Sequence, residues 1–229
     1  MQRYSIVTSK NKREVVLLKA SPCIWGKCSF CDYILDNSPN QQENIILNKK
    51  VLKKVSGIFK SLEVINSGSV FELPYETLVD IKNKVHEKNI NKLFFESHWY
   101  YKERLKEIED FFGIPIIFKF GVETFDDYFR NKVLNKGAYF NHHKEVSKYF
   151  KSICLLVGIK GQTKDMIDRD IDCLLRYFDY GCINIFTPNT TKIEQDKELI
   201  EWFKNKYSFL ESYANIEILW NNIDWGIGG

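Results

Sequence analysis

Short apolar runs alternate with amphipathic stretches along most of this 229-residue chain. The apolar runs are rich in β-branched and aromatic residues, which predicts strands at residues 15–18, 62–65, 92–95, 115–120, 153–157 and 182–186, with a late run at 216–220. The stretches between them predict helices at residues 49–59, 75–87, 101–112, 164–180 and 194–207, and a broken pair across 126–150. Continuously apolar strands that alternate with helices are typical of a parallel sheet covered by helices.

The strands recur at roughly the thirty-residue spacing of βαβ units. Six such units are too few for the closed eight-stranded barrel, so the pattern alone leaves open a partial barrel and a doubly wound open sheet. No linker or low-complexity segment interrupts the chain, and we expect one domain over residues 1–229, with a core at about 14–210 and a C-terminal cap at 211–229. Residues 34–47 form the longest polar stretch and predict a long loop.

Charge and composition narrow the class of partner. The net charge is only +3 and the basic residues are spread along the chain, unlike a protein that binds nucleic acid mainly through phosphates. We therefore expect a small-molecule substrate and no nucleic acid. The chain starts without the apolar run of a signal peptide, and no stretch approaches the ~20 apolar residues of a membrane span, so we expect a cytoplasmic protein with no membrane partner.

Three cysteines in one short segment are the strongest chemical signal. Cys23, Cys28 and Cys31 have the spacing C-x4-C-x2-C, and no fourth Cys or His follows nearby. Structural zinc and ordinary iron–sulfur clusters take four protein ligands. A set of three suits a 4Fe–4S cluster whose fourth iron is left open for a small molecule, while a chance group of reduced thiols and a zinc site completed from afar are the alternatives. The other three cysteines lie in apolar or amphipathic stretches and predict small core side chains: Cys154, Cys173 and Cys182.

Small and polar residues follow the predicted strands at the end where barrel enzymes carry their chemistry. They include Asn66-Ser67-Gly68-Ser69, Glu96, His98, Glu123 and Lys160. The first group also has the composition of an ordinary turn, and the acids could be solvated surface groups. An acid directly after an apolar strand is costly without a partner, however, and a ribose diol or an ammonium group is such a partner. His98 fits a structural or substrate-facing role better than a metal ligand.

Phe30 immediately precedes the last clustered cysteine. Three cysteines with an aromatic before the third resemble the radical SAM superfamily, in which the open iron is chelated by the amino and carboxylate groups of S-adenosylmethionine (SAM). The usual spacing is C-x3-C-x2-C, so this loop is one residue longer in its first gap. The resemblance implies one radical SAM domain of the α/β class, a partial (β/α)6 barrel, with a 4Fe–4S cluster held by Cys23, Cys28 and Cys31, and SAM, as cofactors. The polar stretch 34–47 would wrap the cluster.

The same resemblance implies where SAM binds. The backbone after the second strand would hold its amino group, here at Asn66, Ser67, Gly68 and Ser69, which departs from the usual Gly-Gly-Glu form. Glu123 would hold the ribose hydroxyls, and Glu96 is the second residue to which the resemblance gives this role. Phe30 and the segment around Lys160 would flank the adenine.

Three further segments narrow the resemblance: Cys28-Ser29-Phe30-Cys31-Asp32-Tyr33, Asn66-Ser67-Gly68-Ser69-Val70-Phe71, and Gly121-Val122-Glu123-Thr124 running on to Asn135-Lys136-Gly137. Together they look like the radical SAM lyase that completes archaeosine in tRNA, and they are similar to the family of small bacterial queuine lyases. This implies cleavage of a C–N bond of the free base queuine to 7-aminomethyl-7-deazaguanine, in queuosine salvage, through a 5′-deoxyadenosyl radical. An electron donor such as flavodoxin or ferredoxin is implied as a partner.

A carboxylate can accept two N–H groups from the flat edge of a 7-deazaguanine. Glu72, Asp36 and Asp224 are the candidates, and His98 also faces the same rim. Trp225 in the C-terminal run could cap the substrate by stacking, or simply fill a gap as part of a docked tail. The sequence assigns no catalytic residue. A radical SAM enzyme that modifies tRNA or a peptide, and a non-catalytic Fe–S or zinc module, are the competing hypotheses.

Overall fold

The computed structural model describes residues 1–221 and 223–228. The chain divides into two compact units. The first unit comprises Met1–Gly26, Tyr33–Phe118 and Trp225–Gly229, and the second comprises Lys27–Asp32 and Lys119–Asp224. Within the described residues, no helix has the length and apolar character needed to cross a membrane.

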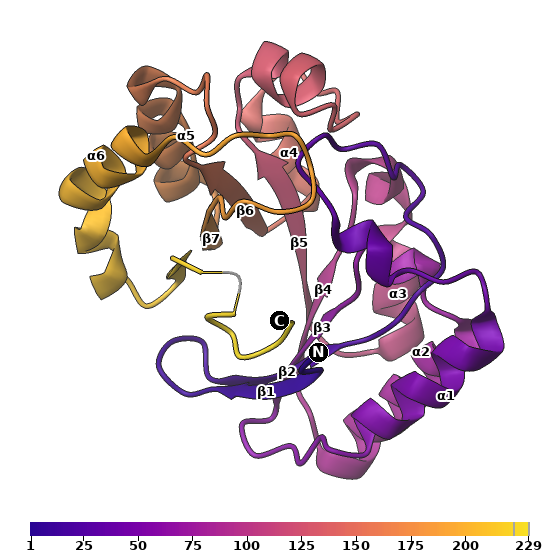
Figure 1. Ribbon diagram of the computed structural model, residues 1–229. Coiled ribbons are helices and arrows are strands. Elements are labelled where there is room, and N and C mark those ends of the chain that lie inside the picture. The colour runs from indigo at the N-terminus through magenta and orange to yellow at the C-terminus, as the bar shows by residue number, and fades with distance from the viewer. Residues whose placement is uncertain (222, 229) are drawn as a thin grey trace. The chain divides into compact units, whose positions relative to one another are not determined.

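The first unit is built on a strongly apolar set of strands. They are β1 (Tyr4–Val7), β2 (Arg13–Leu17), β3 (Ser61–Ile65), β4 (Lys92–Glu96) and the start of β5 (Ile116–Glu123). The helices are α1 (Gln41–Leu52), α2 (Tyr75–Lys88) and α3 (Leu105–Phe112), with 3-10 turns η1 (Tyr33–Asp36), η2 (Val70–Glu72) and η3 (Trp99–Arg104). The pairs β2·β3 and β3·β4 are parallel, and Figure 1 shows the three helices on one side of these strands.

Two local expectations were wrong in this unit. The predicted loop at 34–47 contains η1 and the first turns of α1, which begins at Gln41 because the Asn40 side chain caps it by accepting from the Glu43 amide at 3.2 Å. The helix predicted at 49–59 ends at Leu52, and the following turn places the Gly57 amide on the buried Glu14 carboxylate at 2.6 Å. Strand β1, antiparallel to β2, was not predicted because its side chains are only partly buried.

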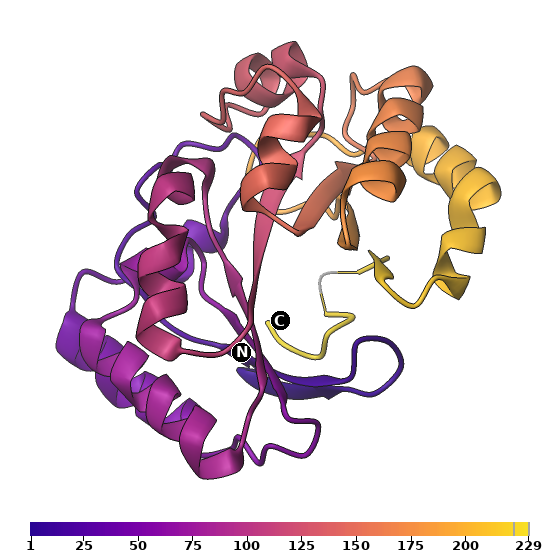
Figure 2. The same cartoon turned by 180° about the vertical axis from the view of Figure 1, so that it is seen from behind.

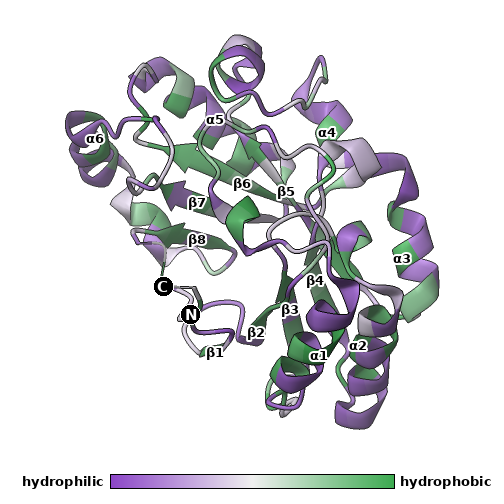
Figure 3. Ribbon diagram, turned by 45° about the vertical axis from the view of Figure 1, so that its right-hand side comes forward, coloured by the Kyte–Doolittle hydropathy of each residue, from purple (hydrophilic) through white to green (hydrophobic). Residues whose placement is uncertain are grey.

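The second unit holds the rest of β5 with β6 (Ser152–Val157), β7 (Tyr180–Ile185) and β8 (Ile216–Leu219), and the pairs β5·β6, β6·β7 and β7·β8 are parallel. Its helices are α4 (His143–Tyr149), α5 (Lys164–Tyr177) and α6 (Lys197–Tyr207), with the π-turn η4 (Phe129–Val133) and the 3-10 turn η5 (Ser208–Ser212). Figure 2 shows α5 and α6 side by side. In Figure 3 the hydrophobic colour is strong on β6, whereas α6 is mainly hydrophilic in colour; α6 buries Leu199, Phe203 and Tyr207 on one face, the amphipathic pattern that the sequence predicted.

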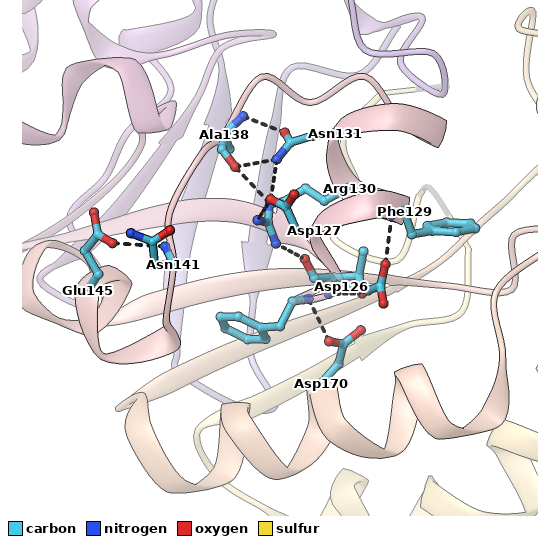
Figure 4. A network of polar contacts seen from close by, with 11 residues as sticks. Asp126, Asp127, Phe129, Arg130, Asn131, Ala138, Asn141, Glu145 and Asp170 are labelled. Carbon is cyan, nitrogen blue, oxygen red and sulfur yellow. Dashed lines mark hydrogen bonds and ion pairs between the residues drawn. The ribbon is translucent and has the colours of Figure 1, made fainter.

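A buried polar network fixes the chain after β5 (Figure 4). The guanidinium of Arg130 is fully buried and donates to the carbonyls of Ala138 and Thr124, each at 2.9 Å. Asn131 donates to the same Ala138 carbonyl at 3.0 Å. Arg130 and Asn131 also donate to the Asp127 carboxylate, at 2.8 and 2.9 Å, so main-chain and side-chain acceptors together hold the π-turn against the segment behind it.

Candidate functional site

The turn after β3 is organised by one carboxylate. Glu72, in η2, accepts hydrogen bonds from the amides of Ser69 and Ile24, the latter at 3.1 Å, and from the Tyr101 hydroxyl. Burial raises the pKa of Glu72, and the amide donors lower it in part. Ile24 follows the first clustered cysteine, so Glu72 joins the start of the cysteine segment to the turn predicted to bind SAM.

This turn is shaped for a close ligand. A Cβ at Gly68 would lie 2.7 Å from the Glu72 Oε2 atom and 3.5 Å from the Cys23 Cβ atom, so only glycine fits. Asn66 is fully buried, and its Nδ2 donates to the Ser69 carbonyl at 2.8 Å. Its Oδ1 is buried and accepts no hydrogen bond from any residue the structure describes. An orphaned buried acceptor is costly, and it fits a ligand that brings N–H donors, such as an ammonium group.

The end of β4 packs against the same turn. The His98 amide donates to the Ser69 hydroxyl at 2.8 Å, and the His98 Nδ1 atom accepts from the Tyr100 amide at 3.2 Å. The indole of Trp25 is nearly parallel to the His98 ring, with centroids 6.3 Å apart. Nδ1 is therefore committed to capping the next turn, which agrees with a structural role. Glu96, the last residue of β4, is half-buried.

In the second unit the later part of the cysteine segment is firmly anchored. The Ser29 amide donates to the Leu134 carbonyl at 2.9 Å, and the Asn135 side chain donates to the Lys27 carbonyl at 2.8 Å. The Asn189 side chain donates to the Phe30 carbonyl at 2.7 Å. These bonds hold the backbone that carries Cys28 and Cys31 in a fixed path.

A buried ion pair lies beside these two cysteines, and the sequence did not predict it. The Lys136 Nζ atom is 2.6 Å from Glu123 Oε1, with both side chains largely buried. A Cβ at Gly121 would lie 2.9 Å from that Nζ atom, so the pair requires glycine there. The Lys136 Nζ atom is also 5.7 Å from the centre of the Phe30 ring. Lys136 lies in the segment Asn135-Lys136-Gly137, which is part of the resemblance to the radical SAM lyases.

The charges around Lys136 are strongly coupled. Burial alone would lower the pKa of Lys136, but the attraction of nearby negative groups, foremost the Glu123 carboxylate, raises it overall. The Cys28 and Cys31 thiols raise the pKa of Lys136 further. A fixed cation in turn favours the thiolate forms that ligate metal. Glu123 itself has a positive φ of 64°, an uncommon backbone conformation at the end of a strand.

The donor chemistry of the cysteines fits an iron–sulfur cluster. All six are free thiols, and Cys23 in the first unit and Cys28 and Cys31 in the second are half-buried, not enclosed. Cys154 and Cys182 are buried core residues, as predicted, whereas Cys173 is half-buried. Among residues 1–221 and 223–228, no group of three or more His, Cys, Asp or Glu side chains is arranged to hold a metal ion.

The remaining predicted residues are engaged with the protein itself. The exposed Lys160 pairs with Glu194 at 2.5 Å, and the nearby amides of Gly158 and Ile159 donate to the Gln162 side chain, each at 2.9 Å. In the segment expected to flank the adenine, these two backbone amides therefore already have a hydrogen-bond acceptor within the protein.

Asp36 forms an ion pair with Arg3. Asp224 is exposed and accepts from the Asn221 amide at 2.9 Å. Trp225 lies 5.2 Å from the Arg13 guanidinium and packs against the core residues of β2, as a docked tail would.

Comparisons with known proteins place the chain. No protein-family model matches it. It is similar over the full length of both chains to the solved structure of queuine lyase from Clostridium spiroforme bound to SAM and queuine, with 50% identity and a TM-score of 0.99. More distant relatives are an uncharacterized protein of Methanocaldococcus jannaschii, 26% identical, and the archaeosine synthase subunit beta of Methanosarcina acetivorans, 25% identical. Each alignment covers 92% of this chain, which spans 64% and 66% of those two proteins.

The full-length match confirms the fold class that the sequence predicted, an α/β partial barrel of the radical SAM type. An identity of 50% over both whole chains also settles the relationship: this chain belongs to the queuine lyase family of radical SAM proteins.

Proposed function

We propose that this chain is a radical SAM lyase that cleaves a C–N bond of free queuine and yields 7-aminomethyl-7-deazaguanine. The observation that carries the proposal is the full-length, 50% identical match to a queuine lyase bound to SAM and queuine. The site residues described above supply groups of the right chemistry for both molecules.

Cys23, Cys28 and Cys31 are the proposed ligands of a 4Fe–4S cluster. When bound, the reduced cluster supplies the electron that splits SAM into methionine and a 5′-deoxyadenosyl radical. The protein's own residues position the reactants and exclude water and oxygen. The unsatisfied Asn66 Oδ1 atom would accept from the SAM ammonium, and Gly68 would let the backbone approach it.

Glu123 is the proposed acceptor for the ribose hydroxyls. Lys136 forms an ion pair with its carboxylate at 2.6 Å and so fixes the position of this side chain. Phe30, whose backbone is anchored by Asn189, presents an aromatic face for the adenine. Glu96 is the second proposed ribose contact.

For queuine, Asp224 is the first proposed reader of the base. It is exposed, and a donor pair from the deazaguanine edge can replace its bond to Asn221. Glu72 is the second candidate from the sequence, but both of its oxygens already accept from backbone amides; Asp36, the third, already pairs with Arg3. Trp225 remains the proposed stacking residue.

We also propose that the protein works in the cytoplasm with a flavodoxin or ferredoxin as its electron donor. All six cysteines are free thiols, as expected in a reducing compartment. A small reduced carrier would deliver the electron that the chemistry needs.

The function is tested by anaerobic incubation of the reconstituted, reduced protein with SAM and queuine, followed by mass spectrometry. We expect about four irons per chain, 5′-deoxyadenosine, and 7-aminomethyl-7-deazaguanine. Cys31→Ala should lose the cluster and both products, whereas Cys154→Ala should keep them. Absence of the aminomethyl product in the wild-type reaction would refute the substrate assignment.

Transfer RNA bearing queuosine is the second substrate to test, because one relative is an archaeosine synthase subunit. Binding to phosphates releases counterions, so activity on tRNA should fall steeply as salt rises. Queuine carries no phosphates, and its turnover should change little over the same range. A salt-sensitive reaction on tRNA with none on queuine would favour the macromolecular substrate.

A further inference from the structure

The turn after β3 forms a closed ring of contacts within the first unit. Glu72 accepts from the Ile24 amide at 3.1 Å, and it also accepts from the Ser69 amide. Ser69 accepts from the His98 amide at 2.8 Å through its hydroxyl. The His98 ring is nearly parallel to the Trp25 ring. Since Trp25 belongs to the cysteine segment, this contact closes the ring.

Both carboxylate oxygens of Glu72 are engaged in this ring. One oxygen accepts from Ile24 and the other from Ser69, and the Tyr101 hydroxyl also donates to the carboxylate. The side chain is 8% exposed. A substrate donor would have to share these oxygens with the two amides in a side chain almost closed to solvent, and any amide that it displaced would be left unsatisfied.

We propose that Glu72 is a positioning residue, not a contact to the substrate: it holds the backbone beside Cys23 against the SAM-binding turn, so that cluster and SAM are bound in register. The proposal rests on the proposed function for the identity of the cofactors. The spacing at Gly68 supports it: a Cβ there would lie only 2.7 Å from the Glu72 Oε2 atom, while the Cys23 Cβ atom, at 3.5 Å, would be in ordinary packing contact.

The chemistry of the site makes Glu72→Gln the informative variant. Every group around the carboxylate is a donor, and glutamine offers one acceptor oxygen and one N–H₂ group of the same size. The variant therefore turns one hydrogen bond into a contact between two donors while the volume is kept. Glu72→Asp retains two acceptor oxygens on a shorter chain. Glu76→Gln, at an exposed position of α2, is the matched control.

Three readouts are measured. We expect Glu72→Gln to weaken SAM binding about tenfold or more, the cost of a lost charged hydrogen bond. The electron paramagnetic resonance spectrum of its reduced cluster should no longer change on SAM addition as the wild-type spectrum does. In the metal-free protein, amide hydrogen exchange should accelerate in peptides containing Ile24 and Ser69. The queuine KM at saturating SAM should stay within about twofold. Glu72→Asp should recover part of the SAM affinity, and Glu76→Gln should match the wild type.

Two results would overturn the proposal. A Glu72→Gln protein with normal SAM affinity and spectrum but a raised queuine KM would make Glu72 a substrate contact. Unchanged exchange at Ile24 and Ser69 would show that the carboxylate does not hold the two segments. If Glu72→Gln does not fold, Glu72→Asp carries the same measurements. If wild-type protein binds SAM but leaves queuine intact, the proposed function fails while SAM binding and exchange still decide the role of Glu72.

Discussion

At the residue scale, the ion pair between Lys136 and Glu123 could not be predicted from the sequence. Lys136 lies thirteen positions after Glu123, and only the π-turn and the buried Arg130 network between them return the chain so that the two charges meet at 2.6 Å. Neither helical nor strand periodicity predicts that meeting. Nor does the sequence show that an amide 48 positions away from Glu72 donates to its carboxylate.

The ion pair gives a direct prediction. In metal-free protein, Lys136→Met leaves Glu123 buried without its partner, and we expect the free energy of unfolding to fall by roughly 3–5 kcal/mol. Urea denaturation measures it. Lys160→Met is the matched control: its pair with Glu194 is as short but exposed, so we expect no measurable change. Equal losses in the two variants would show that burial does not set the strength of these pairs.

At the scale of elements, the buried strands were predicted well. The runs at 62–65, 92–95 and 153–157 lie within the observed β3, β4 and β6 because continuous burial on both faces demands continuous apolar sequence. The start of α1 was not predicted because its first turns are polar and show no helical pattern of apolar residues. The feature that marks the start of this helix is the capping residue Asn40. Strand β1 was missed because a half-exposed edge strand has no such apolar run.

Helix α5 carries the clearest pH dependence. Asp170 is buried and accepts from the Phe125 amide at 2.7 Å (Figure 4), and burial raises the pKa of Asp170 from 3.8 to about 7. The folded state thus keeps a proton that the unfolded state releases at lower pH. Stability contributed by the neutral carboxyl is present below about pH 4 and is lost as pH rises to about 7.

Asp170→Asn should remove this dependence, since the amide oxygen can still accept from Phe125 and cannot ionise. We expect its free energy of unfolding, relative to wild type, to increase between pH 5 and pH 8. Urea denaturation at both values measures the difference. Asp172→Asn, exposed on the same helix, should show no such trend. Parallel pH curves for wild type and Asp170→Asn would contradict the prediction.

At the scale of the whole molecule, the sequence predicted the α/β fold and its cofactor class because both are carried by short, local patterns: apolar runs and three cysteines on one segment. The contacts that complete the site are not local. Asn189 and Leu134 anchor the segment that carries Cys28 and Cys31 from more than a hundred positions away, and their sequence context marks neither of them.

Because the six cysteines differ in burial, their labelling rates can report the fraction of molecules that hold a cluster. Three cysteines of the segment are half-buried, Cys23, Cys28 and Cys31, whereas Cys154 and Cys182 are enclosed in the core. Cys173 is also half-buried, but burial raises the pKa of its thiol to about 11, which slows its reaction with the reagent. A brief iodoacetamide pulse on native, metal-free protein should therefore label the three cysteines of the segment first. A bound cluster would shield those three, so the fraction labelled before unfolding would count the empty molecules in any preparation. Rapid labelling of Cys154 in the native protein would contradict this reading.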